Sequence, residues 1–270
     1  MFSKFTEYAK KVPASWIARR IQVTFFSRSW TGKTRYGYVK GSYNPVFRKL
    51  NLLLRKKKVE ILSDQVLSVE QIKNKVKVIT QNSGVLWYDK VVIATPVSAA
   101  KNILVNKDVK DQLKKYKELN AFAVLLFLKN KFSDYFWINV NEQSTPFTGI
   151  IEMTNLTGTK IFKGINILYL VQYLSDKSSF NGEDFLENMI NHLKQINPNF
   201  KEADIIEQFN SFATGVAPVP FMDYLNNMPP FQSKQSKIFL LNSSMIYPQD
   251  RGVGNSIKLA EKNVDEFIKV

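Results

Sequence analysis

The C-terminal stretch narrows the choice of fold more than any other part of the chain. In KIFLLNSSMIYPQDRGVGNSIKLAEKNVDEFIKV, an apolar run at Ile238–Leu241 precedes polar residues, a glycine-bearing turn at Arg251–Asn255 and a helical pattern. A strand, a loop and a helix in this order aim the first N–H groups of the helix at a ligand. The ending therefore predicts part of an α/β fold with a nucleotide or a flavin near the start of the last helix.

The motif that usually accompanies such an ending does not occur. The single G-x-G is Gly252–Gly254, and Ile257 stands where a third glycine is expected. Neither G-x-G-x-x-G nor the phosphate-binding G-x-x-x-x-G-K-[ST] is present. Taken alone, these glycines predict only a turn before a helix.

Positive charge is concentrated in the first part of the chain. The net charge of the 270 residues is +15, and residues 1–58 carry 15 Lys and Arg against one acid, Glu7. This imbalance leaves two readings open: a solvated basic face, or an anionic partner, which would be an anionic small molecule or an acidic membrane surface. Because no nucleic-acid-binding module accompanies the charge, we expect no nucleic-acid partner.

Composition also limits the chemistry and the compartment. The absence of cysteine excludes disulfides, thiol catalysis and zinc-thiolate sites, and it favours a reducing compartment. The longest apolar run, Ala121–Leu128, is shorter than the roughly 20 residues that span a bilayer. The N-terminus has no signal-peptide pattern. We expect a soluble, cytoplasmic protein, with peripheral contact at the inner face of the membrane as an open alternative.

Hydrophobic periodicity divides the chain into four segments. They are a helical segment (1–35), an α/β segment (36–97), an antiparallel sheet with helices (98–235) and the closing strand, loop and helix (236–270). Within them we expect a helix that Asn44 caps and that runs to about Lys57, a buried strand at Val59–Leu62, and a helix over 108–118. The predicted fold class is α/β plus α+β.

The usual catalytic sets are missing. The only histidine, His192, lies in the middle of a predicted amphipathic helix, so neither a Ser-His-Asp triad nor a histidine metal site is expected. No pair of carboxylates has a spacing that points to acid–base hydrolysis. We therefore predict no catalytic side chain and no metal.

Four stretches, in order along the chain, resemble the flavin-containing amine oxidase and protoporphyrinogen oxidase-like superfamily. They are YGYVKGSYNPVFRKLNLLLRKKKVEILSDQVLSVE, YDKVVIATP, TPFTGIIEMTNL and NSSMIYPQDRGVGNSIKLAEKNVDEFI. The resemblance implies an incomplete Rossmann-like FAD-binding domain with an inserted, mainly antiparallel substrate domain. It also implies site residues: Val66, Thr95, Pro96, Asn242, Arg251, Gly252, Val253 and Gly254 toward FAD, and Tyr38, Glu152, Asn155, Tyr173 and Tyr247 toward a small substrate, for which an anionic molecule is one alternative.

The sequence departs from the superfamily at its start. The N-terminal dinucleotide fingerprint of the family is missing, and its glycine pair reads Gly41-Ser42. We therefore expect the C-terminal portion of a longer flavoprotein, which alone binds FAD weakly or not at all. The implied function is hydride transfer from a C–N or C–C unit of a substrate to flavin. Two alternatives stay open: a half flavoprotein completed by a separate FAD-binding segment, and a mutase-like flavoenzyme acting on a sugar nucleotide.

Overall fold

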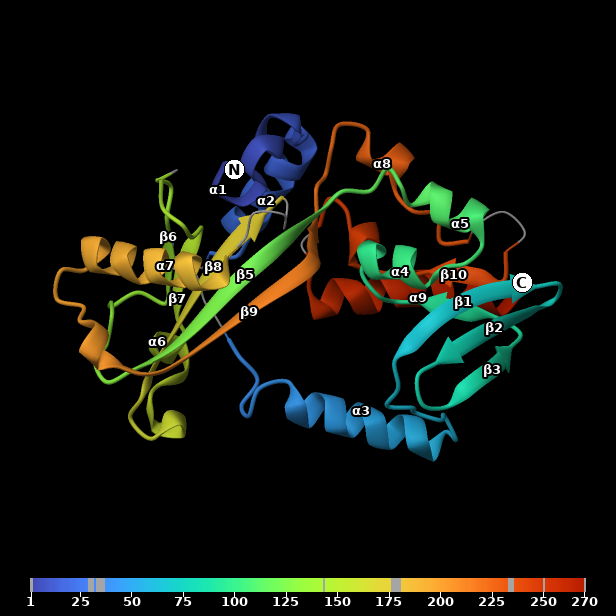
Figure 1. Ribbon diagram of the computed structural model, residues 1–270, viewed down its shortest axis with the longest axis horizontal. Helices are drawn as coiled ribbons and strands as arrows, with labels where there is room; N and C mark the ends of the chain where they lie inside the picture. The colour runs from blue at the N-terminus through green and yellow to red at the C-terminus, as the bar shows by residue number, and fades with distance from the viewer. Residues whose placement is uncertain are drawn as a thin grey trace.

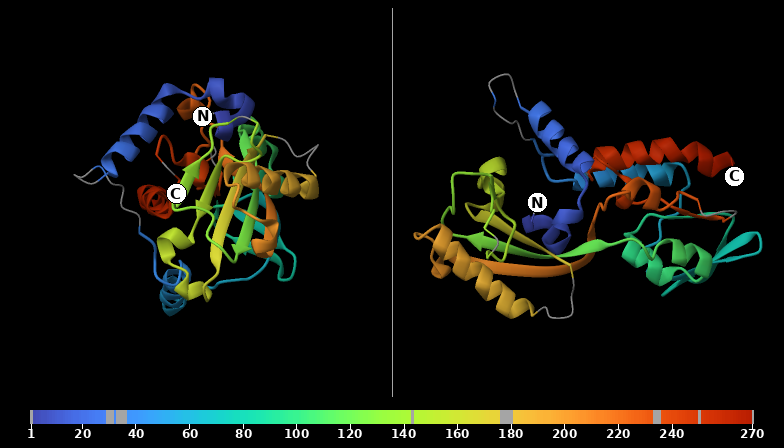
Figure 2. Two further views of the ribbon diagram at one scale, coloured as in Figure 1. Left: turned by 90° about the vertical axis from the view of Figure 1, so that its left-hand side faces the viewer. Right: turned by 90° about the horizontal axis from the view of Figure 1, so that it is seen from above.

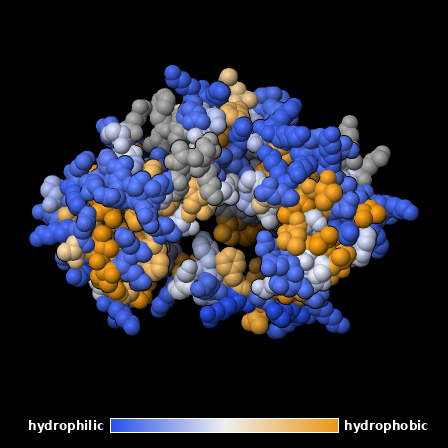
Figure 3. Space-filling model, in the orientation of Figure 1, coloured by the Kyte–Doolittle hydropathy of each residue, from blue (hydrophilic) through white to orange (hydrophobic). Residues whose placement is uncertain are grey.

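The computed structural model describes residues 2–28, 32, 37–142, 144–175, 181–232, 236–249 and 251–269. Figure 1 shows two lobes that are joined by two long strands, and Figure 3 shows the surface hollowed between the lobes. None of the described helices is long and apolar enough to cross a membrane. Within the same residues, no group of three or more His, Cys, Asp or Glu side chains is placed to hold a metal ion.

The first lobe is a five-stranded antiparallel sheet in the order β6-β7-β8-β5-β9, with α7 over one face. Alternate residues of the strands, such as Phe122, Leu126 and Leu170, pack with Met189 of α7 in its core. The elements of this lobe are β5 (Glu118–Leu128), β6 (Trp137–Asn139), β7 (Gly149–Glu152), α6 (Thr154–Thr157), η2 (Lys160–Phe162), β8 (Asn166–Leu174), α7 (Gly182–Ile196), η3 (Glu202–Asp204) and β9 (Ile205–Pro218).

The N-terminal helices cover the other face of this sheet at the end nearest the second lobe. They are α1 (Phe2–Phe5), η1 (Thr6–Lys11) and α2 (Ala14–Phe26). Buried Phe5 and Val12 pack against Leu119 of β5 and Ala217 of β9. This contact brings the basic N-terminal segment against the point where the two long strands leave the first lobe.

The second lobe contains a three-stranded antiparallel sheet and a two-stranded parallel one. Its core includes Val76, Val97, Leu113 and Ile238, so it draws on segments far apart in the sequence. Its elements are β1 (Val66–Ile72), β2 (Lys75–Thr80), β3 (Gly84–Tyr88), β4 (Val91–Ile93), α4 (Val97–Ile103), α5 (Lys107–Gln112), α8 (Tyr224–Asn227), β10 (Ile238–Leu240), η4 (Ser243–Met245) and α9 (Val253–Lys269). Strands β4 and β10 pair in parallel.

Helix α3 (Asn44–Lys56) lies apart from both lobes (Figure 1). None of its residues is buried, although Val46, Leu50 and Leu53 form an apolar stripe at helical spacing. Helix α9 has a similar exposed stripe that includes Val253, Ile257, Val264 and Ile268. Figure 2 shows α3 and α9 end-on in its left panel, where neither helix is enclosed by other elements.

Most of the predicted elements are confirmed, and three are wrong in detail. Residues 59–62 form no strand and Val59 is exposed, because no described strand runs beside them. Tyr43, not Asn44, precedes α3, and no side chain caps that helix. The helix expected over 108–118 is α5, which ends at Gln112, because β5 begins at Glu118.

The four-segment division of the chain stays a prediction. The structure places α4 and α5, which fall in the expected segment 98–235, in the core of the second lobe. The antiparallel sheet expected in the same segment is the sheet of the first lobe.

Gly215 marks the tightest point of the junction between the lobes. Its φ is +65°, and a Cβ there would lie 2.1 Å from Ser98 Oγ and 2.9 Å from Glu118 Oε2. We expect Gly215→Ala to lower the free energy of unfolding by about 3 kcal/mol, measured by urea denaturation. The strain of a positive-φ backbone and the steric overlap of the new Cβ with Ser98 and Glu118 both destabilise the folded state.

The matched control for this experiment is Gly158→Ala. Gly158 has a φ of +74°, but a Cβ there meets nothing within 4 Å. With a ψ of 162° this residue lies in a region that essentially only glycine adopts, so the variant should cost backbone strain alone, on the order of 1–2 kcal/mol. Equal losses in the two variants would show that the junction is not tightly packed at Gly215.

Candidate functional site

Two parallel strands end side by side and carry several of the predicted site residues. Ile93 of β4 is paired with Leu240 of β10, and Leu241 N donates to Ile93 O at 3.0 Å. Thr95 and Asn242, two residues beyond this pair, therefore lie at the same edge, and Pro96 follows as the residue before α4. Ligands of open α/β sheets bind beyond the carboxyl ends of their parallel strands.

Helix α9 begins at this same edge. Near its far end, Phe267 O accepts from Lys90 Nζ at 2.9 Å, and the ring of Phe267 lies 5.0 Å from that of Phe239. Lys90 stands directly before β4, so the last turn of α9 lies at the amino end of the strands. A helix of 17 residues extends about 25 Å, which carries its first turn toward their carboxyl ends.

Asn242 has a buried donor with no partner. Its side-chain Oδ1 accepts from Ser244 N at 3.0 Å and caps η4. Its Nδ2 is buried and has no hydrogen-bond partner among the described residues. A buried amide without an acceptor costs about 1–3 kcal/mol, so the site suits a ligand that brings an acceptor.

The glycine turn leaves space at the start of α9. A Cβ at Gly252 or Gly254 would meet nothing within 4 Å, and Val253 is exposed. The first N–H groups of an α-helix have no intrahelical acceptor, and they carry partial positive charge. Arg251, just before the helix, donates from its guanidinium to the carbonyl of Val216 on β9.

A cavity of about 300 Å³ opens beside this turn. It is lined by Lys4, Phe5, Trp16, Arg20, Pro218, Pro220, Tyr224, Ile246, Tyr247, Gln249 and Arg251. Tyr247 is held by Ser15 Oγ, 2.7 Å from its hydroxyl, and by the ring of Tyr224 at 4.9 Å. Tyr224 donates to Ser244 O at 2.7 Å, and burial, then the negative charge of Glu118, raises the pKa of its phenol. Tyr224 therefore stays a neutral donor.

A second cavity, of about 450 Å³, lies on the sheet face opposite α7. Val171 and Tyr173 of β8 line it, whereas Leu168 and Leu170 of the same strand face the core, as the period of two requires. Its lining is Lys4, Phe5, Trp16, Arg20, Trp137, Asn139, Asn141, Thr148, Gly149, Ile151, Val171 and Tyr173. The first four residues line both cavities, so the N-terminal helices form a shared wall.

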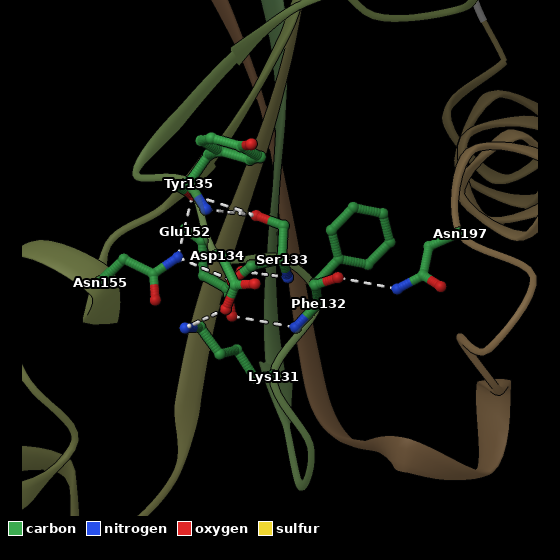
Figure 4. A network of polar contacts seen from close by, with 8 residues as sticks. All are labelled: Lys131, Phe132, Ser133, Asp134, Tyr135, Glu152, Asn155 and Asn197. Atoms are coloured by element: carbon green, nitrogen blue, oxygen red, sulfur yellow. Dashed lines mark hydrogen bonds and ion pairs between the residues drawn. The ribbon is translucent and has the colours of Figure 1, made fainter.

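Figure 4 shows Glu152 and Asn155 in a network of polar contacts with the loop that follows β5. The buried Glu152 carboxylate accepts from Phe132 N at 3.0 Å and from Ser133 N at 2.6 Å. Asn155 Nδ2 donates to the carbonyls of Ser133 and Tyr135, each at 2.9 Å. The two side chains together hold the loop after β5, and neither is among the residues that line the two cavities.

Two further predicted residues also lie outside both linings. Tyr38 is partly exposed, and its hydroxyl reaches Thr157 O at 3.5 Å. Val66 begins β1 and packs against the core of the second lobe. The structure thus brings together Thr95, Pro96, Asn242 and Arg251–Gly254 near one edge, and Tyr173 and Tyr247 on the walls of the cavities. The ligand contacts of all thirteen residues stay predictions.

The sequence did not predict the wall that the N-terminal helices contribute to both cavities. Lys4, Trp16 and Arg20 belong to no motif, and Trp137 and Asn139 stand on a three-residue strand. The available signal was the excess of cationic and aromatic residues in the first helical segment, but sequence does not tell which of them face a cavity.

Neither a protein-family model nor a curated protein sequence matches the chain. Solved structures do match. One is a putative protoporphyrinogen oxidase from Exiguobacterium sp. 255-15, with a TM-score of 0.63 and 11% identity over 85% of this chain and 51% of that one. Another is a putrescine oxidase with redesigned cofactor binding, with a TM-score of 0.57 and 12% identity over 85% and 53% of the two chains. A third, reduced UDP-galactopyranose mutase, has a TM-score of 0.55 and 15% identity over 70% and 42%.

These matches show the fold. The chain has a mixed α/β structure that corresponds to about half the length of flavoprotein oxidase structures of the amine oxidase and protoporphyrinogen oxidase type. Its antiparallel sheet is consistent with the substrate domain of such proteins. The superfamily suggested by the four sequence stretches is therefore the one that the structure matches.

The loop network of Glu152 leads to a stability prediction. We expect Glu152→Ala to lower the free energy of unfolding by about 3 kcal/mol, because the buried N–H of Phe132 and the half-buried N–H of Ser133 lose their carboxylate acceptor. Chemical denaturation measures the loss. The exposed Glu207→Ala on β9 is the control and should change stability by less than about 0.5 kcal/mol. Similar losses of stability in the two variants would show that the hydrogen bonds of Glu152 do not stabilise the loop after β5.

Proposed function

We propose that the chain is the C-terminal portion of an FAD-dependent oxidoreductase that takes a hydride from a C–N or C–C unit of a small substrate. The observation that carries the proposal is the edge where β4, β10 and the start of α9 meet, beside the buried Asn242 Nδ2, which has no hydrogen-bond partner in the described part of the chain. In this proposal, residues 36–97 and 236–270 belong to an incomplete Rossmann-like FAD domain. Residues 1–35 and 98–235 belong to the substrate domain.

The residues at this edge fit a flavin dinucleotide. The Asn242 amide can donate to a pyrophosphate or ribityl oxygen, which would satisfy its buried Nδ2. The open space at Gly252 and Gly254 admits a flat ring close to the backbone. Arg251 and the first turn of α9 add positive charge, which favours an electron-rich group there. Thr95, Pro96 and Val66 complete the proposed cofactor contacts.

The proposed reaction needs little acid–base catalysis by side chains. Bound FAD would accept the hydride, and the protein would orient the substrate and exclude water. Tyr247 and Tyr173 present aromatic walls from two cavities that meet at the N-terminal helices, beside Arg251. Of the two cavities, Tyr224 of α8 lines only the first, and its neutral hydroxyl donates to Ser244 O.

Titration of the purified protein with FAD, followed by flavin fluorescence, tests the cofactor site. We expect weak binding, which Gly254→Leu weakens further by about tenfold because the new side chain fills the open space at the helix start. Ala203→Leu, an exposed substitution in the first lobe, should leave binding unchanged. Unchanged affinity in Gly254→Leu would contradict the site, and a protein purified with stoichiometric FAD would contradict the expected weakness.

A partner-completed flavoprotein is a second candidate, favoured by the exposed surface of the second lobe. Among the described residues, no strand pairs with the outer edge of β4. Parallel sheets normally have both faces covered. An apolar groove of about 340 Å³ lies where α9 meets the sheet, lined by Val92, Phe231, Leu241, Ala260, Glu261, Asn263, Val264 and Phe267.

The occupant that we propose for this groove is a separate polypeptide with a glycine-rich βαβ unit. Such a unit would add a parallel strand beside β4, and it would cover the apolar stripes of α9 and α3. It would also supply the pyrophosphate-binding fingerprint that the sequence does not contain. The chain matches about half the length of the related structures.

Affinity purification of the tagged chain from its native cells tests this completion. We expect Ile257→Asp and Leu50→Asp to abolish capture of a protein that contains G-x-G-x-x-G and raises FAD affinity, because each places a charge in an apolar contact. Ile161→Asp, at an exposed apolar residue of the first lobe, is the control. Capture that survives both substitutions would contradict the docking surface. Binding of anionic vesicles that Leu50→Asp abolishes would indicate a membrane instead.

A further inference from the structure

The outer side of β9 is the longest open sheet edge in the described part of the chain. Strand β9 pairs with β5, and no other described strand pairs with it. The opposite edge of the same sheet, β6, is only three residues long. In the second lobe, the outer side of β1 is covered, because Val105 N donates to Val69 O at 3.1 Å. Unpaired N–H and C=O groups along a long edge are ready to pair with another strand.

Residues 207–213 form the regular part of this edge. Their register with β5 runs without a shift, whereas it shifts beyond each end of the segment. Toward the second lobe, the carbonyl of Val216 accepts from the guanidinium of Arg251. The part of the edge that can take a further strand is therefore 207–213.

This segment lacks the features that normally keep edge strands apart. Natural edges carry lysines, prolines or bulges that prevent pairing. In a chain of net charge +15, residues 202–233 contain neither Lys nor Arg, and Glu207 is the only charged residue of β9. Phe209 is 50% exposed, and its ring lies 5.8 Å from that of Phe127 on β5. An exposed ring on an edge without cations favours pairing with another strand.

The segment is complementary to itself. Two copies that run antiparallel about a two-fold axis at Asn210 place Phe209 of one copy opposite Ser211 of the other. The same register places Glu207 opposite Ala213. Side chains in such cross-strand pairs lie about 5 Å apart, so each large side chain meets a small one and the carboxylate meets no second charge. Both size and charge therefore fit a second copy of this chain.

We propose that two copies of the chain pair along β9 in this register, so that their five-stranded sheets become one continuous antiparallel sheet. This surface lies on the first lobe, whereas the apolar groove beside α9 lies on the second (Figure 1). Neither flavin nor a βαβ unit takes part in the pairing. The dimer therefore goes beyond the proposed function and does not depend on it.

Sedimentation equilibrium of the purified protein tests the dimer. We expect the mean mass to rise from 31.1 kDa toward twice that value as the protein concentration increases to about 100 μM. Hydrogen exchange should show rising protection of residues 207–213 over the same range, and no change in β6. A mass that stays at the monomer value would overturn a second copy as the occupant of this edge.

Charge variants at the two-fold axis assign the contact to this register. Asn210→Lys places two cations opposite each other and should weaken dimerisation by about tenfold, and Asn210→Asp should do the same with two carboxylates. A one-to-one mixture of the two variants should dimerise at least as well as the unsubstituted protein, because opposite charges then meet at the axis. Such recovery separates loss of pairing from loss of folding.

Asn188→Lys, at an exposed position of α7 in the same lobe, is the matched control and should leave dimerisation unchanged. An equal loss in Asn188→Lys and Asn210→Lys, or a mixture of the Asn210 variants that stays monomeric, would overturn the pairing about Asn210. Dimers that persist in each Asn210 variant alone would place the contact elsewhere and would overturn it too.

Discussion

The carboxylate of Glu118 is the contact on which the arrangement of the two lobes depends. It accepts from Val97 N at 3.1 Å and from Ser98 N at 2.7 Å, so it caps the start of α4 from the first residue of β5. Ser244 Oγ of η4 reaches the same carboxylate at 3.4 Å. Glycine at position 215 leaves the space in which these groups meet. One side chain thus ties together the segments after β4 and β10 and the two long strands.

That junction explains how the edge at the carboxyl ends of β4 and β10 and the walls of the two cavities can lie next to each other. The segments after β4 and β10 supply Thr95 and Asn242, and the long strands β5 and β9 carry the sheet whose open face forms the second cavity. The N-terminal helices pack at the same junction, where Phe5 contacts Leu119 of β5 and Ala217 of β9. The proposed flavin site and the proposed substrate site would therefore be neighbours, with Arg251 next to both.

Local patterns predicted much of the fold. Val76, Val78 and Thr80 alternate in sequence, and all three are buried in β2; the amphipathic pattern over 182–196 forms α7 with Met189 and Leu193 in the core. The expectation failed at Val59–Leu62, because a strand needs a partner that local sequence does not reveal. The family resemblance implies that Glu152 faces a substrate, and this contact stays a prediction. The structure shows that its carboxylate accepts from backbone N–H groups 19 and 20 residues away in the chain, which local sequence does not reveal.

The sequence by itself determined the kind of protein: an α/β chain with a mainly antiparallel sheet, a glycine turn at the start of its last helix, and basic residues gathered near its beginning. Periodicity and short motifs act over a few residues, so these features can be read locally. Only the tertiary structure decided that Lys4, Trp16 and Arg20 line cavities together with Tyr173 and Arg251, and that the Nδ2 of Asn242 is buried with no hydrogen-bond partner among the described residues. Those facts depend on contacts between segments more than 100 residues apart, which no local pattern encodes.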